Sequence, residues 1–394
     1  MKQKNYIVYH DSCLDGFLAG FITHYKALYD GISNIVMVPL NYKESSVEAF
    51  ANKVNSNDTL TIVDFSFNNK LIDELVTRGV QVTIVDHHKA FIENFFGESY
   101  IDKNFINNKK SYHLWSMCDC DNFSLFSKLV SNETTNFYDL AVYSSYNDYK
   151  EKENQYKRSG AGLCLELLQH DKEFIKFLTT FAKEEIFDTI NIAQQYDLWL
   201  HDGKPLTLAN YLALWFYGWY DKQKVLRDKI INEPQNSNDY FILLKALFIN
   251  TPLETKISQG ANIYNERKEK IDELCIKAQR VIINPLSGIN SEKIKVGFIN
   301  SEEVSKLGIS MTGSNLLKRF NYDVAIMIAI TTEETITYSL RSDKERLDVD
   351  LTLFINNLVK AGVAVSGGGH KNAAGITFAK LPNNENNFFK PFEN

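Results

Sequence analysis

Acidic and imidazole side chains directly follow three short apolar runs in the N-terminal part of the chain. The runs are residues 6–9, 59–63 and 82–85, and the polar residues that follow them are His10-Asp11, Asp64 and Asp86-His87-His88. Carboxylates and imidazoles suit divalent cations such as Mn2+, Mg2+ or Fe2+, and thiolates are absent from this set. The pattern therefore predicts metal-dependent chemistry carried out by residues that lie far apart in the sequence.

The elements that must position these residues are strands and helices in alternation. Short apolar, β-branched runs predict strands that are buried on both faces of a parallel sheet. Helical patterns lie between them, at residues 15–29 and 69–78. This alternation predicts βαβ units and a doubly wound α/β fold. Because such sheets bind ligands at the carboxyl ends of their strands, the three polar segments are expected to converge at one edge.

Each polar segment also has an explanation that involves no chemistry. Asp15 could be only the N-cap of the helix that it opens, and Asp64 could cap the helix that follows it. Asp197, in the sequence Tyr-Asp-Leu-Trp, could belong to a surface turn or a helix cap. Residues 86–88 are the hardest to explain by packing, and there one imidazole could bind metal while the carboxylate orients it.

The length of 394 residues exceeds what one core usually supports, so two domains are expected. We place a catalytic domain at residues 1–250, a helical linker at 251–282 and a smaller α/β domain at 283–394. The pattern of residues 160–248 is mostly helical, and the charged stretch 257–281 predicts a long helix, which we interpret as a solvated connector. The strands predicted after it are residues 294–299, 324–330 and 335–340.

Bulk properties exclude several classes of protein. The net charge of −6 disfavours a protein that grips long nucleic acid, because duplex binding needs a basic surface. The cysteines form no Cys-x2-Cys pair, so a structural zinc site is not expected. No signal-peptide core and no membrane-spanning run are present, and a reducing, cytoplasmic setting is expected.

Four segments, in this order, resemble the four motifs of the DHH phosphoesterase family. They are His10 with Leu14-Asp15-Gly16, then Asp64, then Asp86-His87-His88, and finally Asp197. The stretch 158–161, Arg-Ser-Gly-Ala, is also similar to a segment that recurs between the last two motifs. A single such triplet has little specificity, whereas four motifs in the correct order have far more. Residues 90–157 and 205–255 have no clear match and could accommodate a specific substrate or partner.

The C-terminal part resembles the domain that accompanies DHH domains. Residues 366–375 are similar to its glycine-rich GGGH signature, and Arg341 lies in a strand where that domain has a substrate-facing arginine. Glycine lets backbone N–H groups cradle phosphate oxygens, and the arginine fork binds phosphate in a bidentate manner. The substrate-binding residues that the resemblance implies are Arg341, Ser342, Gly367, Gly368, Gly369, His370 and Lys371.

The resemblance also implies roles at the metal site, with Mn2+ as the expected cation and Mg2+ as the alternative. The ligands of one ion would be His10, Asp15 and Asp64, those of a second ion would be Asp64, His87 and Asp197, and the catalytic residues would be Asp86 and His88. In this scheme His88 stabilises the phosphorus centre or the leaving oxygen.

One position departs from the family pattern. Phe17 stands where many relatives have a second acid that helps to hold the second ion. Either Asp11 supplies the missing carboxylate or that ion is held more weakly, so one ion and two ions both stay open.

The activity that the resemblance implies is hydrolysis of phosphodiester bonds by metal-activated water. Short oligonucleotides and linear or cyclic dinucleotides are the expected substrates and partners, with no long duplex and no membrane; a homodimer is left open. The alternatives are a RecJ-like single-strand exonuclease, disfavoured by the acidic balance, and a catalytically inactive nucleotide sensor, which Phe17 keeps open. Polyphosphate hydrolysis is disfavoured because the GGGH signature belongs to the nucleotide-processing branch.

Overall fold

The computed structural model describes residues 3–11, 13–42, 44–88, 112–116, 140–144, 158–169, 171–198, 207–222, 237–283, 294–343 and 350–380. The chain divides into two compact units. The first comprises Met1–Leu198 and Phe216–Lys256, and the second comprises Trp199–Trp215 and Ile257–Asn394.

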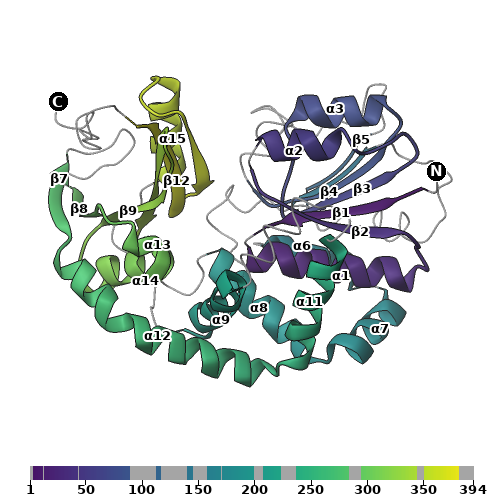
Figure 1. Cartoon of the computed structure of the whole chain (residues 1–394), viewed down its shortest axis with the longest axis horizontal. Coiled ribbons are helices and arrows are strands. Elements are labelled where there is room, and N and C mark those ends of the chain that lie inside the picture. The colour runs from purple at the N-terminus through teal and green to yellow at the C-terminus, as the bar shows by residue number, and fades with distance from the viewer. Residues whose placement is uncertain are drawn as a thin grey trace. The chain divides into compact units, whose positions relative to one another are not determined.

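A parallel sheet forms the centre of the first unit, with six strands in the part of the chain that the structure describes (Figure 1). The strands are β1 (Asn5–His10), β2 (Ile35–Leu40), β3 (Thr59–Val63), β4 (Gln81–Val85), β5 (Tyr112–Ser116) and β6 (Leu140–Ser144). Their order is β2-β1-β3-β4-β6-β5, and each neighbouring pair is parallel. The three strands predicted from the apolar runs are therefore confirmed, and they are adjacent in the sheet.

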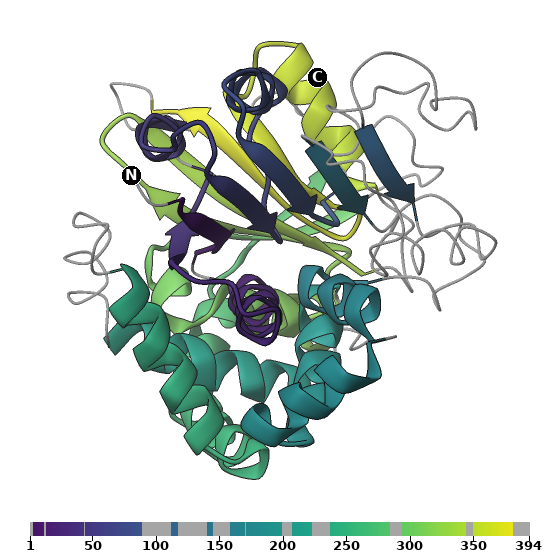
Figure 2. The ribbon, with the colours of Figure 1, turned by 90° about the vertical axis from the view of Figure 1, so that its right-hand side faces the viewer.

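Helices cover both faces of this sheet. Helices α2 (Glu44–Ala51) and α3 (Asn69–Thr77) lie on one face, and α1 (Leu14–Tyr29) and α6 (Gly160–Leu168) lie on the other (Figures 1 and 2). Side chains of α2 and α3 pack against β1, β3 and β4 in a core that includes Phe50, Leu60 and Leu75. Because the central strands are covered on both sides, nearly all of their positions are buried or half-buried, and apolar residues predominate. The doubly wound α/β fold class predicted from the sequence is confirmed.

The helical pattern predicted for residues 160–248 is confirmed wherever the structure describes it. The helices that follow α6 are α7 (Lys172–Ala182), α8 (Glu185–Asp197), α9 (Leu208–Lys222) and α11 (Ser237–Asn250). Among the described helices, none has both the length and the apolar character needed to span a bilayer.

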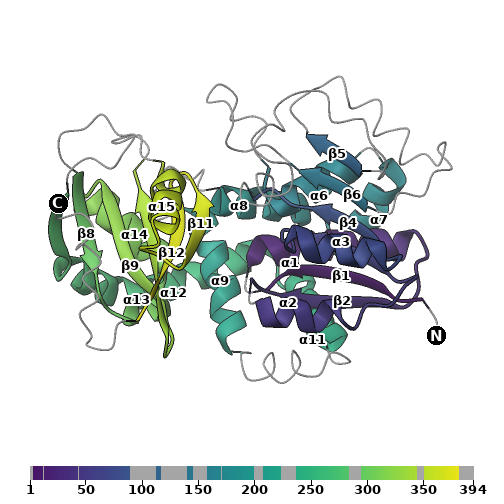
Figure 3. The same cartoon turned by 90° about the horizontal axis from the view of Figure 1, so that it is seen from above.

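The second unit contains a mixed sheet. Its described strands are β7 (Gln279–Ile283), β8 (Ile294–Ile299), β9 (Val324–Thr331), β10 (Thr335–Ser342), β11 (Ser366–His370) and β12 (Ala373–Ala379). Their order is β11-β12-β10-β9-β8-β7, with β8 and β9 parallel and the other pairs antiparallel. Helix α15 (Leu351–Lys360) lies against β11 and β12 (Figure 3). The remaining helices are α13 (Glu303–Leu307), α14 (Ile309–Ser314) and a π-helical turn at Asn315–Arg319. The strands predicted in this region are confirmed.

The long charged helix α12 (Leu253–Ile276) differs from its prediction in length and in burial. It ends at Ile276, and residues 279–281, which were predicted to be its end, belong to β7. Tyr264, Ile271 and Cys275 of α12 are buried in a core that they share with Met311. The interpretation as a solvated connector is therefore wrong for this part of the helix, because its charged side chains cover one side while the other side packs.

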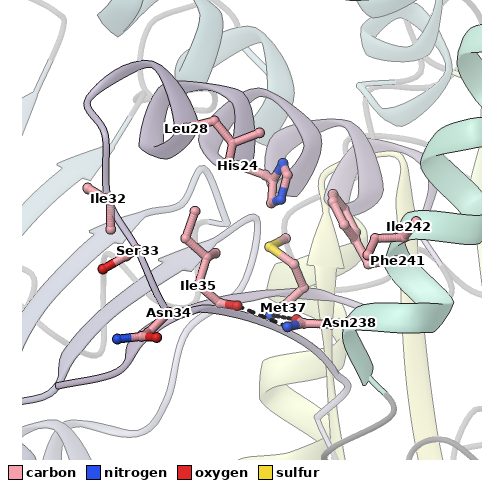
Figure 4. A pocket seen from close by; sticks show the side chains of 10 residues that line it. All are labelled: His24, Leu28, Ile32, Ser33, Asn34, Ile35, Met37, Asn238, Phe241 and Ile242. Carbon is pink, nitrogen blue, oxygen red and sulfur yellow. Dashed lines mark hydrogen bonds between the residues drawn. The ribbon is translucent and has the colours of Figure 1, made fainter. Parts of the chain in front are cut away.

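A pocket of about 360 Å³ lies between α1, the start of β2 and α11 (Figure 4). Asn238 joins two of these elements, since its Oδ1 accepts from the N–H of Met37 at 2.6 Å and its Nδ2 donates to the carbonyl oxygen of Ile35 at 2.9 Å. His24 points from α1 into this pocket (Figure 4). Because Ile35 and Met37 lie in the first half of β2, the pocket is at the opposite end of the sheet from the polar residues that follow β1, β3 and β4.

Acidification is expected to destabilise the first unit through His24. Burial first, and Lys245 second, lower the pKa of His24 from 6.5 to about 4. The unfolded chain therefore binds this proton at a higher pH than the folded chain does, so the stability is fully present above pH 6.5 and is lost as the pH falls toward 4. This loss should be about 3 kcal/mol at most. Denaturant unfolding of wild type and His24→Gln at neutral and acidic pH should show a smaller pH dependence in the variant, and equal pH dependence would contradict this assignment.

Candidate metal centre

The polar residues that follow β1, β3 and β4 meet at the carboxyl edge of the first sheet. Strand β1 pairs with β2 on one side and with β3 on the other, so the strand order reverses between β1 and β3. Such a switch point leaves a crevice outside the carboxyl ends of the strands, where α/β proteins bind ligands. His10 ends β1, Asp64 directly follows β3, and residues 86–88 directly follow β4. The structure thus brings the three predicted segments together.

Asp64 lies at the centre of this cluster, with 1% of its surface exposed. Its Oδ1 lies 3.0 Å from Nε2 of His87, and its Oδ2 lies 3.6 Å from Nδ1 of His10. The φ of Asp64 is +52°, in the left-handed region that residues other than glycine rarely adopt. Such a backbone costs about 1–3 kcal/mol and is found mostly at functional sites. The conformation is therefore better explained by the position that it gives the carboxylate than by the stability of the strand end.

Two glycines make room for the Asp64 carboxylate. A Cβ atom on Gly160, the first residue of α6, would lie 2.5 Å from Cβ and 2.6 Å from Oδ1 of Asp64. A Cβ atom on Gly16 would lie 2.5 Å from the carbonyl oxygen of His10 and 3.1 Å from Oδ2 of Asp64. Glycine is therefore required at both positions for a steric reason. Helix α1 approaches His10 and Asp64 closely at Gly16, and α6 approaches Asp64 closely at Gly160.

Asp15 is held at the N-terminal ends of two helices. It lies in the first turn of α1, and its Oδ1 accepts a hydrogen bond of 2.6 Å from Oγ of Ser159, the N-cap of α6. The N–H of Ala161 lies within hydrogen-bond distance of both Asp15 oxygens, at 3.3 and 3.2 Å. The N-cap of α1 is Cys13, so the alternative in which Asp15 is only a cap is wrong. Burial first, followed by Asp64, raises the pKa of Asp15 well above its usual value, which indicates a local excess of negative charge.

Asp197 is the last residue of α8 and joins the same cluster. Its Oδ2 lies 3.3 Å from Nε2 of His87. The C-terminal end of a helix carries partial negative charge, so a carboxylate there is unfavourable unless a positive group faces it. Burial would lower the pKa of His87, but Asp197 and Asp64 outweigh burial and raise this pKa to about 10. A stabilising cap therefore does not explain Asp197, whose carboxylate instead faces the imidazole of His87.

Asp86 contacts His88 rather than His87. The Oδ1 atom of the fully buried Asp86 lies 2.7 Å from Nδ1 of His88 and accepts from the backbone N–H of His88 at 3.2 Å. Burial opposes protonation of His88, but Asp86 and Asp64 together raise its pKa. The two adjacent histidines thus have different nearest carboxylates, since His87 contacts Asp64 and Asp197 whereas His88 contacts Asp86.

Three overlapping groups of described side chains have ligand atoms within 4.8 Å of one another, as binding to one cation requires. They are His10-Cys13-Asp64, Asp64-His87-His88 and Asp15-His87-Asp197. Asp64 and His87 each belong to two groups. None of the groups contains all three ligands predicted for the first ion, because Asp15 is in a different group from His10 and Asp64. The ligands predicted for the second ion, Asp64, His87 and Asp197, are divided between two groups that share His87.

Buried polar atoms without partners make this cluster suitable for a cation. Among the described residues, Oδ2 of Asp64, Oδ2 of Asp197 and Nδ1 of His10 are buried and have no hydrogen-bond partner. Burial of such atoms is costly unless they are paired. These atoms belong to different ligand groups, and a divalent cation bound in each group could pair with them. Carboxylate oxygens and imidazole nitrogens are suitable donors for such cations. The residues present therefore fit a divalent metal.

The structure also locates Phe17, which stands where many relatives have an acidic ligand, and Asp11, its possible replacement. Phe17 is 1% exposed, and its ring centroid lies 5.7 Å from that of Phe216 and 5.4 Å from that of Phe248, so it belongs to the core. Asp11 is buried but belongs to none of the three groups, so it gains no support as a replacement ligand. Cys13, which the sequence analysis did not select, does belong to one. Its only sequence signal was its position between His10 and Asp15.

The predicted substrate-binding residues of the second unit lie on neighbouring strands. Arg341 of β10 is opposite Ala373 of β12, which is in turn opposite His370 of β11. The Nη1 of Arg341 donates to Oγ of Ser339 at 2.7 Å and to the carbonyl oxygen of Leu340 at 2.8 Å. The register thus aligns Arg341 and His370 in one row across the sheet.

The glycine-rich run, whose backbone N–H groups were expected to cradle phosphate, is the strand β11 and pairs with β12. A Cβ atom on Gly367 would lie 2.4 Å from Cγ2 of Ile355, and one on Gly369 would lie 2.7 Å from the carbonyl oxygen of Ala373. These two glycines are therefore explained by close packing. Gly368 differs, because a Cβ atom there would meet nothing within 4 Å.

Ser342 and Lys371 contribute to the structure of the second unit. Ser342 is fully buried, and its Oγ accepts a hydrogen bond of 2.9 Å from Nδ2 of Asn372. The carbonyl oxygen of Lys371 accepts from the N–H of Leu351, at the start of α15, at 2.8 Å. The hydrogen bond of Ser342 gives its side chain a role within the unit, whereas that of Lys371 involves only the backbone.

An exposed tyrosine borders the polar cluster of the first unit. Tyr42 is 57% exposed, and its ring centroid lies 4.7 Å from that of Phe65 and 5.1 Å from that of His10. Its centroid is also 6.1 Å from that of His88. The ring is thus supported by neighbouring side chains while much of its surface stays accessible, which gives a flat aromatic surface beside the candidate metal ligands.

Comparisons with known proteins find likeness in structure and none in sequence. No protein-family model matches the sequence, and no curated protein sequence matches it. Among solved structures the chain is similar to CDC45 from Entamoeba histolytica, with 10% identity and a TM-score of 0.43, over 95% of this chain and 92% of that one.

Proposed function

We propose that the chain is a metal-dependent phosphodiesterase of the DHH type that hydrolyses short oligonucleotides or dinucleotides. The observation that carries the proposal is the cluster of buried Asp64 and His87 with half-buried Asp197 at the switch point of a parallel sheet. The order of the sequence motifs supports the reaction type. The net charge of −6 favours a short substrate over a long polymer.

The ligand atoms of these groups, apart from His88, would hold one or two divalent cations, with Asp64 shared between groups. When bound, such cations stabilise developing charge on a phosphoryl group and lower the pKa of water. In their absence, Nε2 of His87 lies close to the carboxylates of Asp64 and Asp197. Cation binding at these carboxylates is expected to displace the proton of His87, because metal ligation requires the neutral imidazole.

His88 would bind the phosphate of the substrate. Asp86 orients the ring through Nδ1 and favours its protonated form. A protonated imidazole makes charge-assisted hydrogen bonds to phosphoryl oxygens, and these strengthen as negative charge develops in the transition state. Asp86 would thus act as a positioning residue for His88.

Tyr42→Ala is expected to raise KM for a dinucleotide about tenfold while kcat changes little, because stacking of a base on an aromatic ring is worth about 1–3 kcal/mol. Tyr42→Phe is the matched control, since it keeps the ring and should retain the KM of wild type. Steady-state kinetics on one dinucleotide would measure both. An unchanged KM in Tyr42→Ala would contradict a stacking role.

Hydrolysis of a small substrate panel tests the proposed function. The panel contains a linear dinucleotide, a cyclic dinucleotide, a short RNA and a long single-stranded DNA, each with Mn2+ and with Mg2+. The full chain is expected to cleave the short substrates, and the double variant Asp86→Ala/His87→Ala is expected to be inactive while it remains folded.

The other outcomes separate the rival functions. Preferential cleavage of the long DNA would support an exonuclease of the RecJ type. No cleavage by a folded protein that binds metal and nucleotide would overturn the enzyme and favour a nucleotide sensor.

A further inference from the structure

Cys13 places a thiol next to His10 and Asp64. The sulfur lies within 4.8 Å of a ligand atom of each residue. Cys13 is the N-cap of α1, a position where Ser, Thr, Asp and Asn are preferred because their oxygens accept hydrogen bonds from the first turn. Cysteine is not among the preferred residues, and its sulfur is only a weak hydrogen-bond acceptor. Helix capping is therefore a weak reason for a cysteine at this position.

The two neighbours of Cys13 present buried atoms toward the same point. Oδ2 of Asp64 and Nδ1 of His10 lie 3.6 Å apart, and neither has a hydrogen-bond partner among the described residues. The Asp64 side chain is 1% exposed. A carboxylate oxygen, an imidazole nitrogen and a thiol sulfur thus meet in one place, and a cation would pair with all three.

We propose that Sγ of Cys13 is a ligand, together with His10 and Asp64, of one cation in the proposed metal centre. Thiolate sulfur is a soft ligand that favours Zn2+, Co2+ or Fe2+ and disfavours Mg2+. The other two groups contain only oxygen and nitrogen donors. The positions are therefore chemically unequal, and the inference deepens the proposed function by assigning a softer cation to the His10-Cys13-Asp64 position.

Cobalt binding to the metal-free full chain tests this assignment. A thiolate ligand gives a sulfur-to-cobalt charge-transfer band in the near ultraviolet, whereas the visible bands of Co2+ report any set of ligands. Wild type is expected to show both features, and Cys13→Ser is expected to lose the ultraviolet band while it keeps visible bands. The affinity of this variant for Zn2+ should also fall by more than about tenfold. Loss of an outer-shell partner already costs about tenfold or more in metal affinity, and a direct ligand should cost more.

Cys164→Ser is the matched control for this experiment. Cys164 is a buried thiol in the same unit, its Sγ lies 3.9 Å from Oγ1 of Thr23, and it belongs to none of the ligand groups. This variant should keep the charge-transfer band.

The outcomes distinguish this inference from the proposed function. Visible cobalt bands without a charge-transfer band in wild type would overturn the thiolate ligand and leave the phosphodiesterase proposal intact. A charge-transfer band that survives in Cys13→Ser would also overturn it. Absence of any cobalt binding would overturn the metal centre and the proposed function together.

Discussion

Asp64→Asn is expected to lower phosphodiester hydrolysis by about 10³-fold or more, the scale seen when a central catalytic group is removed. Asparagine keeps the size of the side chain and tolerates the left-handed backbone at this position, so the variant should fold. It removes the charge that is shared by two of the three ligand groups. A saturating cation stabilises wild type by about 2.7 kcal/mol at 100 times its Kd, and the variant should lose this stabilisation as well.

Asp58→Asn provides a matched control at the other end of the same strand. Asp58 directly precedes β3, is 4% exposed, and accepts hydrogen bonds from the N–H groups of Lys4 and Asn55. Its substitution should reduce stability without changing the response to Mn2+. Equal activity of the Asp64 and Asp58 variants would contradict the central role of Asp64.

Gly160→Ala is expected to reduce activity about 100-fold, the cost of a displacement of roughly 1 Å at a reacting group. The three nearest atoms to the added Cβ all belong to Asp64, at 2.5, 2.6 and 2.8 Å, so Asp64 must move. Alanine is a better helix former than glycine, and α6 itself should not suffer. The unfolding free energy should nevertheless fall by about 1–3 kcal/mol through overpacking.

A double-mutant cycle assigns this loss to the contact with Asp64. In an Asp64→Gly background the opposing side chain is absent, so Gly160→Ala should cost little or even stabilise the protein. Equilibrium unfolding of the four proteins without metal gives the coupling. An equal cost of Gly160→Ala in both backgrounds would show that the substitution acts elsewhere.

The centre of the first sheet could be predicted because its strands are covered on both faces and are therefore rich in apolar and β-branched residues. The ends of the predicted strands then located His10, Asp64 and residues 86–88 at one edge. Strand β2 was not predicted because Pro39 interrupts its pattern. Proline lacks a backbone donor and is confined to edge strands, and β2 is indeed an edge strand in the described sheet.

The remaining differences arise from contacts that a sequence does not display. The glycine-rich run was expected to cradle phosphate, but Gly367 and Gly369 are explained by neighbours that approach from α15 and β12. The buried side of α12 could not be predicted from its charged sequence, because it depends on contacts with helices that lie elsewhere in the sequence. Cys13 was not predicted to be a ligand because it belongs to no Cys-x2-Cys pair, the pattern that usually indicates thiolate ligands. The grouping of Asp15 with His87 and Asp197 depends on where α8 ends relative to α1, which no local pattern specifies.

The most direct test of the metal centre is an anomalous difference map from crystals of the full chain grown with Mn2+. The account predicts a peak within about 2.0–2.5 Å of a carboxylate oxygen of Asp64, with His87 or Asp197 as a further ligand. A map of well-ordered protein with no peak at Asp64, at a Mn2+ concentration that supports maximal hydrolysis, would contradict it.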